Sequence, residues 1–127
     1  MRSLELTHDV AVDTKDALDQ LSLLPGVSFV ALMDREGFLM DCAGRPAGDA
    51  EAVAAMASCL LETSAGIGGE LGHGALRCMI SEFDNGLVLA MGAAASSRLV
   101  VVLHDVAALA AARRSAHRVI AALPCTL

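Results

Sequence analysis

The chain has 127 residues, which is enough for one domain with its own core. It carries a net charge of −6 and is 55% hydrophobic, yet it has only three Phe and no Trp or Tyr. An acidic chain with so few rings for bases to stack on is unlike a nucleic-acid-binding protein, and its core must be built from small and aliphatic side chains. So much small apolar surface suggests close helix packing and a second chain that covers part of it.

The N-terminal residues 1–12 show no clear periodicity and no apolar segment typical of a secretory signal. We predict that they form a tail or an extra element ahead of a single domain over residues 13–127. Residues 13–24 predict a short amphipathic helix, because Leu18, Leu21 and Leu24 share one stripe. Asp13 or Thr14 can cap its start, and Pro25 and Gly26 end it.

Residues 27–42 predict a β-hairpin that is apolar on both faces. The first strand, over 27–33, places Val27, Phe29, Ala31 and Met33 on one face and Val30 and Leu32 on the other. The turn "DREG" ends in Gly37, which is free to adopt a positive φ, and residues 38–42 return as the second strand. Since both faces of the first strand are apolar, we expect the sheet to be covered on both sides.

A long helix is predicted over residues 50–71, with Asp49 as its cap and glycines in its last turns that should make it fray or bend. The expected core stripe consists of Val53, Ala57, Leu60, Ser64, Ile67 and Leu71, and the expected opposite side of Glu51, Ala55, Ser58 and Glu62. A second apolar strip is formed by Ala52, Met56, Cys59 and Thr63. A helix so apolar around its circumference, in an outer layer, is predicted to be shared with another helix.

Three strands are predicted over 75–83, 87–92 and 98–103, with "DNG" at 84–86 as a hairpin turn and "AAASS" as the next turn. A closing helix over 106–123 follows, with Asp105 as its cap, Pro124 after its end, and a core stripe of Leu109, Ala112, Ala116, Val119, Ile120 and Leu123. The order α-β-β-α-β-β-β-α with short turns predicts a three-layer α/β/α sandwich around a five-stranded antiparallel sheet.

No set of residues suggests catalysis, and we predict no catalytic, cofactor-binding or metal-binding residues. The segment "GIGGELGHG" follows a helix and leads into a strand, which is the reverse of a phosphate-binding loop. The four histidines make no H-x-x-x-H pattern. Cys42, Cys59, Cys78 and Cys125 sit among apolar neighbours, which predicts reduced, buried thiols that label slowly in a cytoplasmic protein. The longest apolar run, from Leu99, is too short to span a membrane.

Basic residues gather on the closing helix at Arg113, Arg114, His117 and Arg118. The simplest interpretation is a solvated face that also complements the helix dipole. A contact with acidic groups is the alternative, and the predicted first helix offers Asp13, Asp16 and Asp19 for an internal one.

With these segments in hand, the chain resembles the roadblock/LC7 family. The resemblance runs from about Leu18 to Leu123 and rests on "LLPGVSFVALMDREGFLMDCAG", on residues 49–92 and on "RLVVVL" before a last helix. The family has no catalytic signature, so the order and spacing of the elements carry the resemblance. The stretch "DVAALAAARR" departs from an Asn-Leu-Gly-like patch that the family often has early in its last helix.

The resemblance implies a non-enzymatic, cytoplasmic homodimer whose long helices pack together and whose third strands pair. It further implies a scaffold for signalling that docks a small Ras-like GTPase, as bacterial members do. The residues expected at the dimer and partner interface are Glu51, Ala52, Ala55, Met56, Ser58, Cys59, Glu62, Thr63, Ala75, Arg77, Met79 and Ser81. Two alternatives remain open: a small-ligand sensor domain of similar layout with an internal cavity, and a sensor-kinase-associated adaptor that does not contact a GTPase.

Overall fold

The computed structural model describes residues 14–92 and 97–123. An N-terminal helix covers residues 14–22. The elements that follow are β1 (Val27–Asp34), β2 (Leu39–Gly44), α2 (Ala50–Glu70), β3 (Met79–Phe83), β4 (Gly86–Gly92), β5 (Ser97–Leu103), a 3₁₀ turn (Val106–Ala108) and α3 (Leu109–Ala122). The predictions for residues 1–12, for Asp13 as a cap, for the turn at 93–96, for Pro124 and for Cys125 lie outside the described residues.

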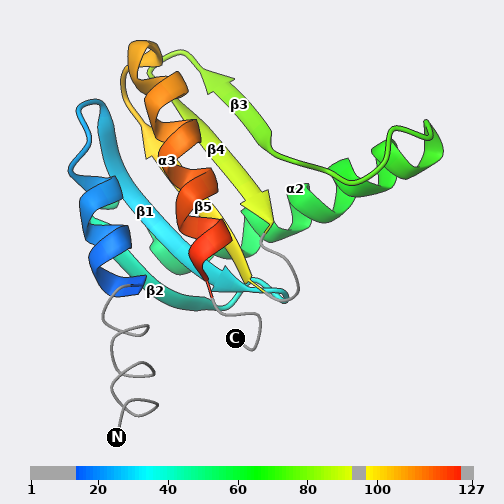
Figure 1. The fold of residues 1–127 in the computed structure, drawn as a ribbon, viewed down its shortest axis with the longest axis horizontal. Helices are drawn as coiled ribbons and strands as arrows, with labels where there is room; N and C mark the ends of the chain where they lie inside the picture. Colours follow the sequence, from blue (N-terminus) through cyan, green and yellow to red (C-terminus); the bar gives the residue numbers. More distant parts are fainter. Residues whose placement is uncertain (1–13, 93–96, 124–127) are drawn as a thin grey trace, which may run out of the picture.

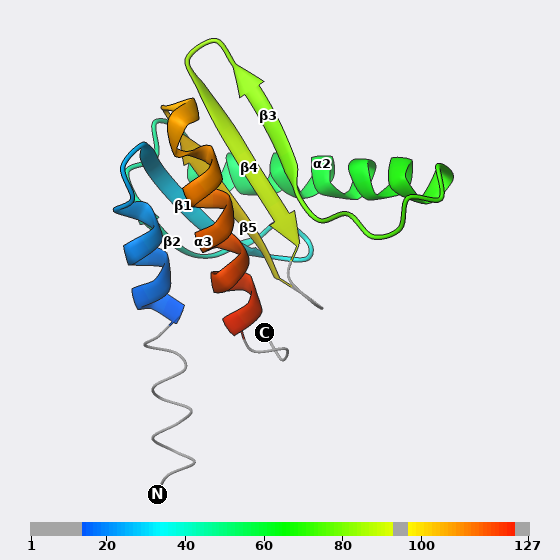
Figure 2. The same ribbon diagram turned by 45° about the horizontal axis from the view of Figure 1, so that its top comes forward.

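The five strands form one antiparallel sheet in the order β2-β1-β5-β4-β3. Helix α2 lies across one face of the sheet, and the N-terminal helix and α3 lie side by side on the other (Figure 1 and Figure 2). The predicted three-layer α/β/α sandwich is therefore confirmed. Its two outermost strands, β2 and β3, each have a neighbour on one side only.

Two separate cores explain why the strands are apolar on both faces. One packs Leu18 and Leu21 of the N-terminal helix and the small residues of α3 against Val30 and Leu32 of β1. The other packs α2 against Phe29, Ala31 and Met33 on the opposite side of the same strand, and all three are essentially buried. Burial on both faces is what a covered sheet needs, since a side chain of this size gains about 1.5–3 kcal/mol when it leaves water.

One residue of β1 lies on the other side from its prediction. Val27 packs with Val30 and Leu32 rather than with Phe29. The register between β1 and β5 shifts between Val27 and Phe29, so an irregularity reverses the alternation at the start of the strand. The residue types alone do not predict that shift, because the cores on both faces of β1 are apolar and a valine can be buried in either one.

The local signals at turns and helix starts are mostly confirmed. Gly37 has a φ of +95° in the β1–β2 turn, and the Asp49 carboxylate accepts hydrogen bonds from the backbone N–H groups of Glu51 and Ala52 at the start of α2. Asp105 caps a 3₁₀ turn rather than α3 itself, which begins at Leu109. The buried side of α3 is as predicted, with Ala112, Ala116 and Val119 in the core.

Two other boundaries differ from the predictions, and so does the effect of the glycines in α2. The second strand begins at Leu39, because Phe38 is still in the turn and is 68% exposed. The third strand begins at Met79 rather than at residue 75, so the chain between α2 and β3 has no ladder partner over 75–78. Finally, α2 continues as a regular helix to Glu70, so the glycines at 66, 68 and 69 do not break it.

Candidate interaction surface

The face of α2 that points away from the sheet is apolar. The buried residues of the helix are Ala54, Ala57, Ser58 and Leu61, which follow the i, i+3, i+4, i+7 spacing of one helical stripe. On the opposite side lies a set of uncharged residues that we call the outer face of α2: Ala52, Met56, Cys59, Leu60, Thr63 and Ile67. Met56, Leu60 and Ile67 are 60%, 50% and 57% exposed.

The C-terminal half of α2 extends beyond the sheet. Both views of the ribbon show it continuing past β3, and the chain returns alongside it to enter that strand (Figure 1 and Figure 2). None of the residues from Glu62 to Leu71 is buried, and Leu71 is 61% exposed. An outer face with several large apolar side chains on a protruding helix is the kind of surface that marks a protein contact.

By length and composition alone, α2 would be long enough and apolar enough to cross a membrane, and it is the one described helix of which this is true. The prediction from the sequence that no segment spans a membrane rested on the run from Leu99, which is a different segment of the chain. Ala54, Ala57 and Leu61 are nevertheless part of the core on the α2 side of the sheet. Inserting α2 into a bilayer would therefore expose Phe29 and Met33, which it covers. A protein contact made by the outer face while α2 stays packed on the sheet avoids this loss of hydrophobic free energy.

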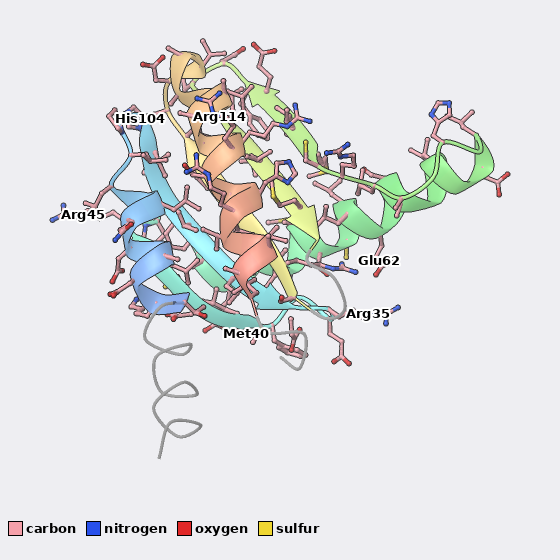
Figure 3. All side chains as sticks on the ribbon, viewed as in Figure 1. Arg35, Met40, Arg45, Glu62, His104 and Arg114 are labelled. Atoms are coloured by element: carbon pink, nitrogen blue, oxygen red, sulfur yellow. The ribbon has the colours of Figure 1, made fainter. Side chains whose placement is uncertain are left out.

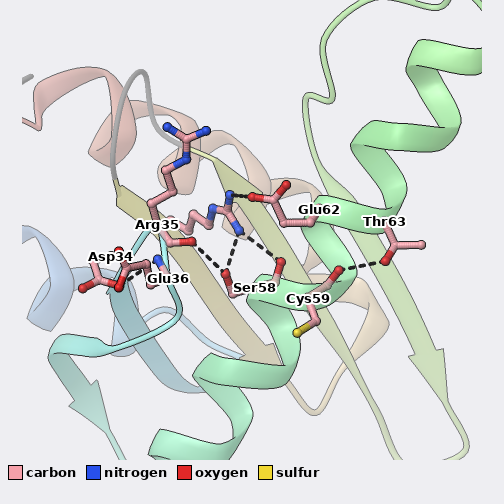
Figure 4. Close-up of polar contacts among 8 residues, drawn as sticks. Asp34, Arg35, Glu36, Ser58, Cys59, Glu62 and Thr63 are labelled. Atoms are coloured by element: carbon pink, nitrogen blue, oxygen red, sulfur yellow. Dashed lines mark hydrogen bonds and ion pairs between the residues drawn. The ribbon is translucent and has the colours of Figure 1, made fainter.

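A polar cluster joins α2 to the sheet beside this surface (Figure 4). The Arg98 guanidinium at the start of β5 donates to the carbonyl and hydroxyl oxygens of Ser58 at 3.0 and 2.7 Å, and it forms an ion pair with Glu62. The Ser58 hydroxyl in turn donates to the Arg35 carbonyl in the β1–β2 turn at 3.2 Å. The Arg98 side chain is only 13% exposed, so the cluster fixes how α2 sits on the sheet and hence where its outer face points.

Sequence analysis did not single out Arg98. It predicted that Ser58 lies opposite the core and faces a partner, which is wrong, because Ser58 is 4% exposed and its hydroxyl points to Arg98 and the turn. The signal that could have found the pair is the cation in "SSRLVVVL", a lone arginine at the start of a buried strand that needs acceptors.

The electrostatics of this cluster give a pH prediction. The hydrogen bond from Arg98 and then the charge of Arg98 lower the pKa of the Glu62 carboxyl below its usual 4.5. Desolvation opposes this shift, and the charge of Arg35 adds a lesser lowering effect. A lowered pKa means that Glu62 contributes stability above pH 4.5 and loses it as the pH falls through the lowered value. In urea unfolding, Glu62→Gln should therefore be less stable than wild type at neutral pH, and the difference should disappear in acid.

The matched control is Glu70→Gln, at the other end of α2, where the described residues provide no ion pair for the carboxylate. Its unfolding midpoint should follow the wild type at every pH. A stability difference for Glu62→Gln that stays constant from neutral to acid would contradict the pairing with Arg98.

The other predicted interface residues lie at two places. Glu51, Ala52, Ala55, Met56, Cys59, Glu62 and Thr63 all lie on exposed or partly exposed sides of α2. Ala75 and Arg77 precede β3 and are exposed, while Met79 and Ser81 lie within this edge strand and are half-buried. Met79 packs against the core cluster that contains Ala54, Ala57 and Leu61 of α2, so β3 lies beside this helix. The role of both groups in an interface stays a prediction.

The prediction of buried thiols is wrong for Cys59. It is exposed on the outer face of α2, while Cys42 and Cys78 are half-buried and all three are free thiols. The error follows from the wrong phase of the helix, since the sequence analysis placed Cys59 among apolar residues without knowing which side meets the sheet. Cys59 should therefore label quickly in a single chain and slowly only where a partner covers it.

Elsewhere, the described residues offer little for chemistry. Within 14–92 and 97–123, no three His, Cys, Asp or Glu side chains come together as a metal site. A hollow of about 210 Å³ lies between the N-terminal helix and α3, lined by Ala17, Gln20, Leu21, Leu24, Ser115, Arg118 and Val119. Because Gln20 and Arg118 are exposed, this hollow opens to solvent and is not the internal cavity expected of a sensor domain.

The basic residues of α3 do not contact the acidic residues of the N-terminal helix. Asp19 forms its ion pair with Lys15 of the same helix, at 3.6 Å, and in the described part of the chain Asp16 and the α3 arginines form none. Asp13 lies outside the described residues. Among the described residues, the alternative of an internal acidic contact for Arg113, Arg114 and Arg118 is therefore not found, and the favoured interpretation of a solvated basic face fits the structure.

Comparison with known proteins identifies the family. Solved structures with the same fold include a Roadblock/LC7 domain from Streptomyces avermitilis, with 20% identity and a TM-score of 0.75 over 84% of this chain and 91% of that one. MglB from Myxococcus xanthus has 17% identity and a TM-score of 0.78 over 87% and 90%. An MglB described as having a tetrameric arrangement has 18% identity and a TM-score of 0.79 over 90% and 87%.

No curated protein matches the chain. The family model of the Roadblock/LC7 domain matches residues 13–103, which include the N-terminal helix, α2 and all five strands. The element order, the sheet and the two helical layers agree with this match. The chain therefore belongs to the roadblock/LC7 family.

Proposed function

We propose that the chain is a non-enzymatic, cytoplasmic scaffold that forms a homodimer and docks a small Ras-like GTPase. The observation that carries the proposal is the apolar outer face of α2, with Met56, Leu60 and Ile67 each at least half exposed. A single chain gains nothing from holding these side chains in water, whereas a partner helix would bury them.

Two copies of α2 packed against each other would cover most of the outer face. Small residues such as Ala52 and Cys59 would let the helices approach closely, and Met56 adapts well to an irregular contact. The strand β3 has a neighbour on one side only, so its free backbone groups could pair with a second β3 and extend the sheet. The similarity to an MglB with a tetrameric arrangement supports self-association.

Docking of a GTPase rests on the family and on the lack of a catalytic centre among the described residues. The roadblock/LC7 proteins of bacteria that this chain resembles regulate small Ras-like GTPases, and its fold is similar to that of a Thermus thermophilus gliding protein, mglB, with a TM-score of 0.76 at 17% identity. Charged residues beside the outer face, such as Glu51 and Glu62, would tune the encounter rate more than the affinity.

The test is a binding assay with each Ras-like GTPase of the same genome, loaded with GDP or with a GTP analogue. At least one should bind with a Kd below about 100 µM, or roughly −5.5 kcal/mol, and one nucleotide state should be favoured. Leu60→Glu, on the outer face, should weaken that binding, and Leu23→Glu, an 80% exposed residue that follows the N-terminal helix, should not.

If no GTPase binds while the protein remains a dimer, the GTPase proposal is wrong and the sensor-kinase-associated adaptor becomes the better interpretation. Pull-down with the sensor kinases of the same genome would then be the next measurement. A small-ligand sensor has less support, because the hollow beside Leu21 and Arg118 is open to solvent.

A further inference from the structure

The two edge strands of the sheet differ in what occupies their outward backbone groups. Both β2 and β3 pair with a neighbour on one side only, so each could accept a strand from another molecule. In the middle of β2, the backbone N–H and C=O of Cys42 already form hydrogen bonds with side chains. At β3 they are not, since no side chain of the described residues bonds to the backbone of Met79–Phe83.

The outward direction of Cys42 in β2 follows from its neighbours. Directly after β2, the N–H of Arg45 donates to the Ser28 carbonyl at 2.9 Å, so the backbone of Arg45 faces β1. Within an antiparallel strand the N–H and C=O of one residue point to the same side, and successive residues alternate. The register is regular from Asp41 to Gly44, so Cys42 faces away from β1 toward the open edge.

Both outward groups of Cys42 have side-chain partners. Its N–H donates to the Asp41 carboxylate at 2.8 Å, and its carbonyl accepts a hydrogen bond from the Lys15 ammonium, also at 2.8 Å. Lys15 comes from the N-terminal helix, 27 residues earlier in the chain, and reaches over the edge of the sheet. The two side chains therefore take the positions that a neighbouring strand would need in the middle of β2.

The two side chains also hold each other. The Lys15 ammonium lies 3.4 Å from the Asp41 carboxylate and 3.6 Å from that of Asp19. Desolvation alone would lower the pKa of Lys15, but the charges of Asp41 and Asp19 raise it overall, so the ammonium remains a donor at neutral pH. Asp19 is one turn along the same helix, which keeps Lys15 directed toward β2.

We propose that Lys15 and Asp41 form an edge guard that closes β2 to strand addition and leaves β3 as the edge through which this sheet can be extended. The need for a guard is visible in the side chains at β2. Met40 in β2 is 41% exposed, and Phe38 in the turn just before β2 is 68% exposed. An open β2 would therefore combine free backbone groups with apolar side chains and would pair with β2 of a second copy. Figure 3 labels Met40. It also shows that Arg45, which directly follows β2, points away from the molecule on the side opposite Glu62.

A chain with two usable edges would associate without limit, because β3 and β2 lie at opposite ends of the sheet order. Each copy could then join one neighbour at each edge, and the contacts would generate an open chain of molecules rather than a closed pair. The guard therefore limits association to one end of the sheet. This inference does not depend on the proposed function, because it concerns the difference between wild type and variants, whatever assembly the wild type forms.

The test measures mass by sedimentation for wild type, Lys15→Met and the double variant Lys15→Met/Asp41→Ala. Methionine keeps the length of the lysine side chain but donates no hydrogen bond. The mass of the wild type should level off at one closed assembly as concentration rises, whereas the mass of the double variant should exceed that limit at least about twofold and continue to grow with concentration. Lys15→Arg, which retains a cationic donor, should behave like the wild type.

A third variant identifies the edge that is used. Adding Met40→Lys to the double variant places a charge on the opened edge and should return the mass to that of the wild type. Thermal unfolding confirms that each variant is folded. If the Asp41 change prevents folding, Lys15→Met carries the test alone, because Lys15 is an exposed residue.

The proposal is overturned if the folded variants without Lys15 or Asp41 keep the mass of the wild type at every concentration. If Lys15 and Asp41 only hold the N-terminal helix against β2, the variants should keep the wild-type mass and should unfold at a lower temperature. Growth that Met40→Lys does not reverse would also overturn it, because the association would then use another surface.

Discussion

Met56→Glu is expected to convert the proposed homodimer into monomers. Met56 is 60% exposed near the middle of the outer face of α2, where a partner helix would bury it. A carboxylate there would lose its hydration on association without a cation on the same face to compensate it. A penalty of about 3 kcal/mol would weaken the dimer roughly a hundredfold.

Sedimentation measures this directly, and the thiol of Cys59 gives a second measurement. Cys59 is exposed on the same face, so it should label slowly in the wild-type dimer and quickly in Met56→Glu, while the half-buried Cys42 in β2 should label at the same rate in both. Leu23→Glu is the matched control, because it places the same charge on an exposed apolar residue of the other helical layer. A wild-type protein that is already a monomer, or a Met56→Glu variant that remains a dimer, would contradict the interface.

Gly44→Ala is expected to destabilise the fold itself. Gly44 ends β2 with a φ of +86°, a conformation that costs an alanine about 1–2 kcal/mol. A Cβ at this position would also lie 2.5 Å from the Ser28 carbonyl oxygen and 3.1 Å from the Cα of Phe29, and both are backbone atoms of β1 that cannot move aside alone. We expect a loss of more than about 2 kcal/mol in the free energy of unfolding, measured by urea denaturation.

Gly48→Ala is the control, four residues later in the loop that follows β2. No atom lies within 4 Å of a Cβ built at Gly48, and its φ is not positive, so the substitution should be neutral or slightly stabilising. Equal stability of the two variants would show that β2 does not turn away from β1 at Gly44 in the way the structure describes.

The sequence by itself determined the order of the elements and the layers of the fold. Residues such as Gly37, Asp49 and Asp105 act through bonds to groups within a few residues, so their positions can be derived from local chemistry alone. The strands around Phe29 and Val101 are apolar on both faces, which is enough to require helices on both sides of the sheet. The resemblance to the roadblock/LC7 family, which rests on this order, is confirmed by the family model.

Only the tertiary structure decided which side of α2 meets the sheet. The predicted core stripe ran through Ala57, Leu60 and Ile67. Ala57 is buried as predicted, but Leu60 and Ile67 are exposed, and Ala54 and Leu61 are buried in their place. A helix with apolar residues around most of its circumference gives no clear phase, because burial of either side gains hydrophobic free energy. Close approach to the sheet favours the small side chains of Ala54 and Ala57 together with Leu61, and larger side chains such as Met56 remain exposed on the outer face.

The contacts that fix the surfaces of this protein join residues far apart in the chain. Arg98 reaches Ser58 across 40 positions, and Lys15 reaches Cys42 across 27. Each pairing depends on which strands are neighbours and on the register between them. A register shift of one residue would change which residue of an edge strand faces outward. Local sequence fixes where helices and strands form, whereas the direction of a side chain at an edge or interface follows from packing of the whole sheet.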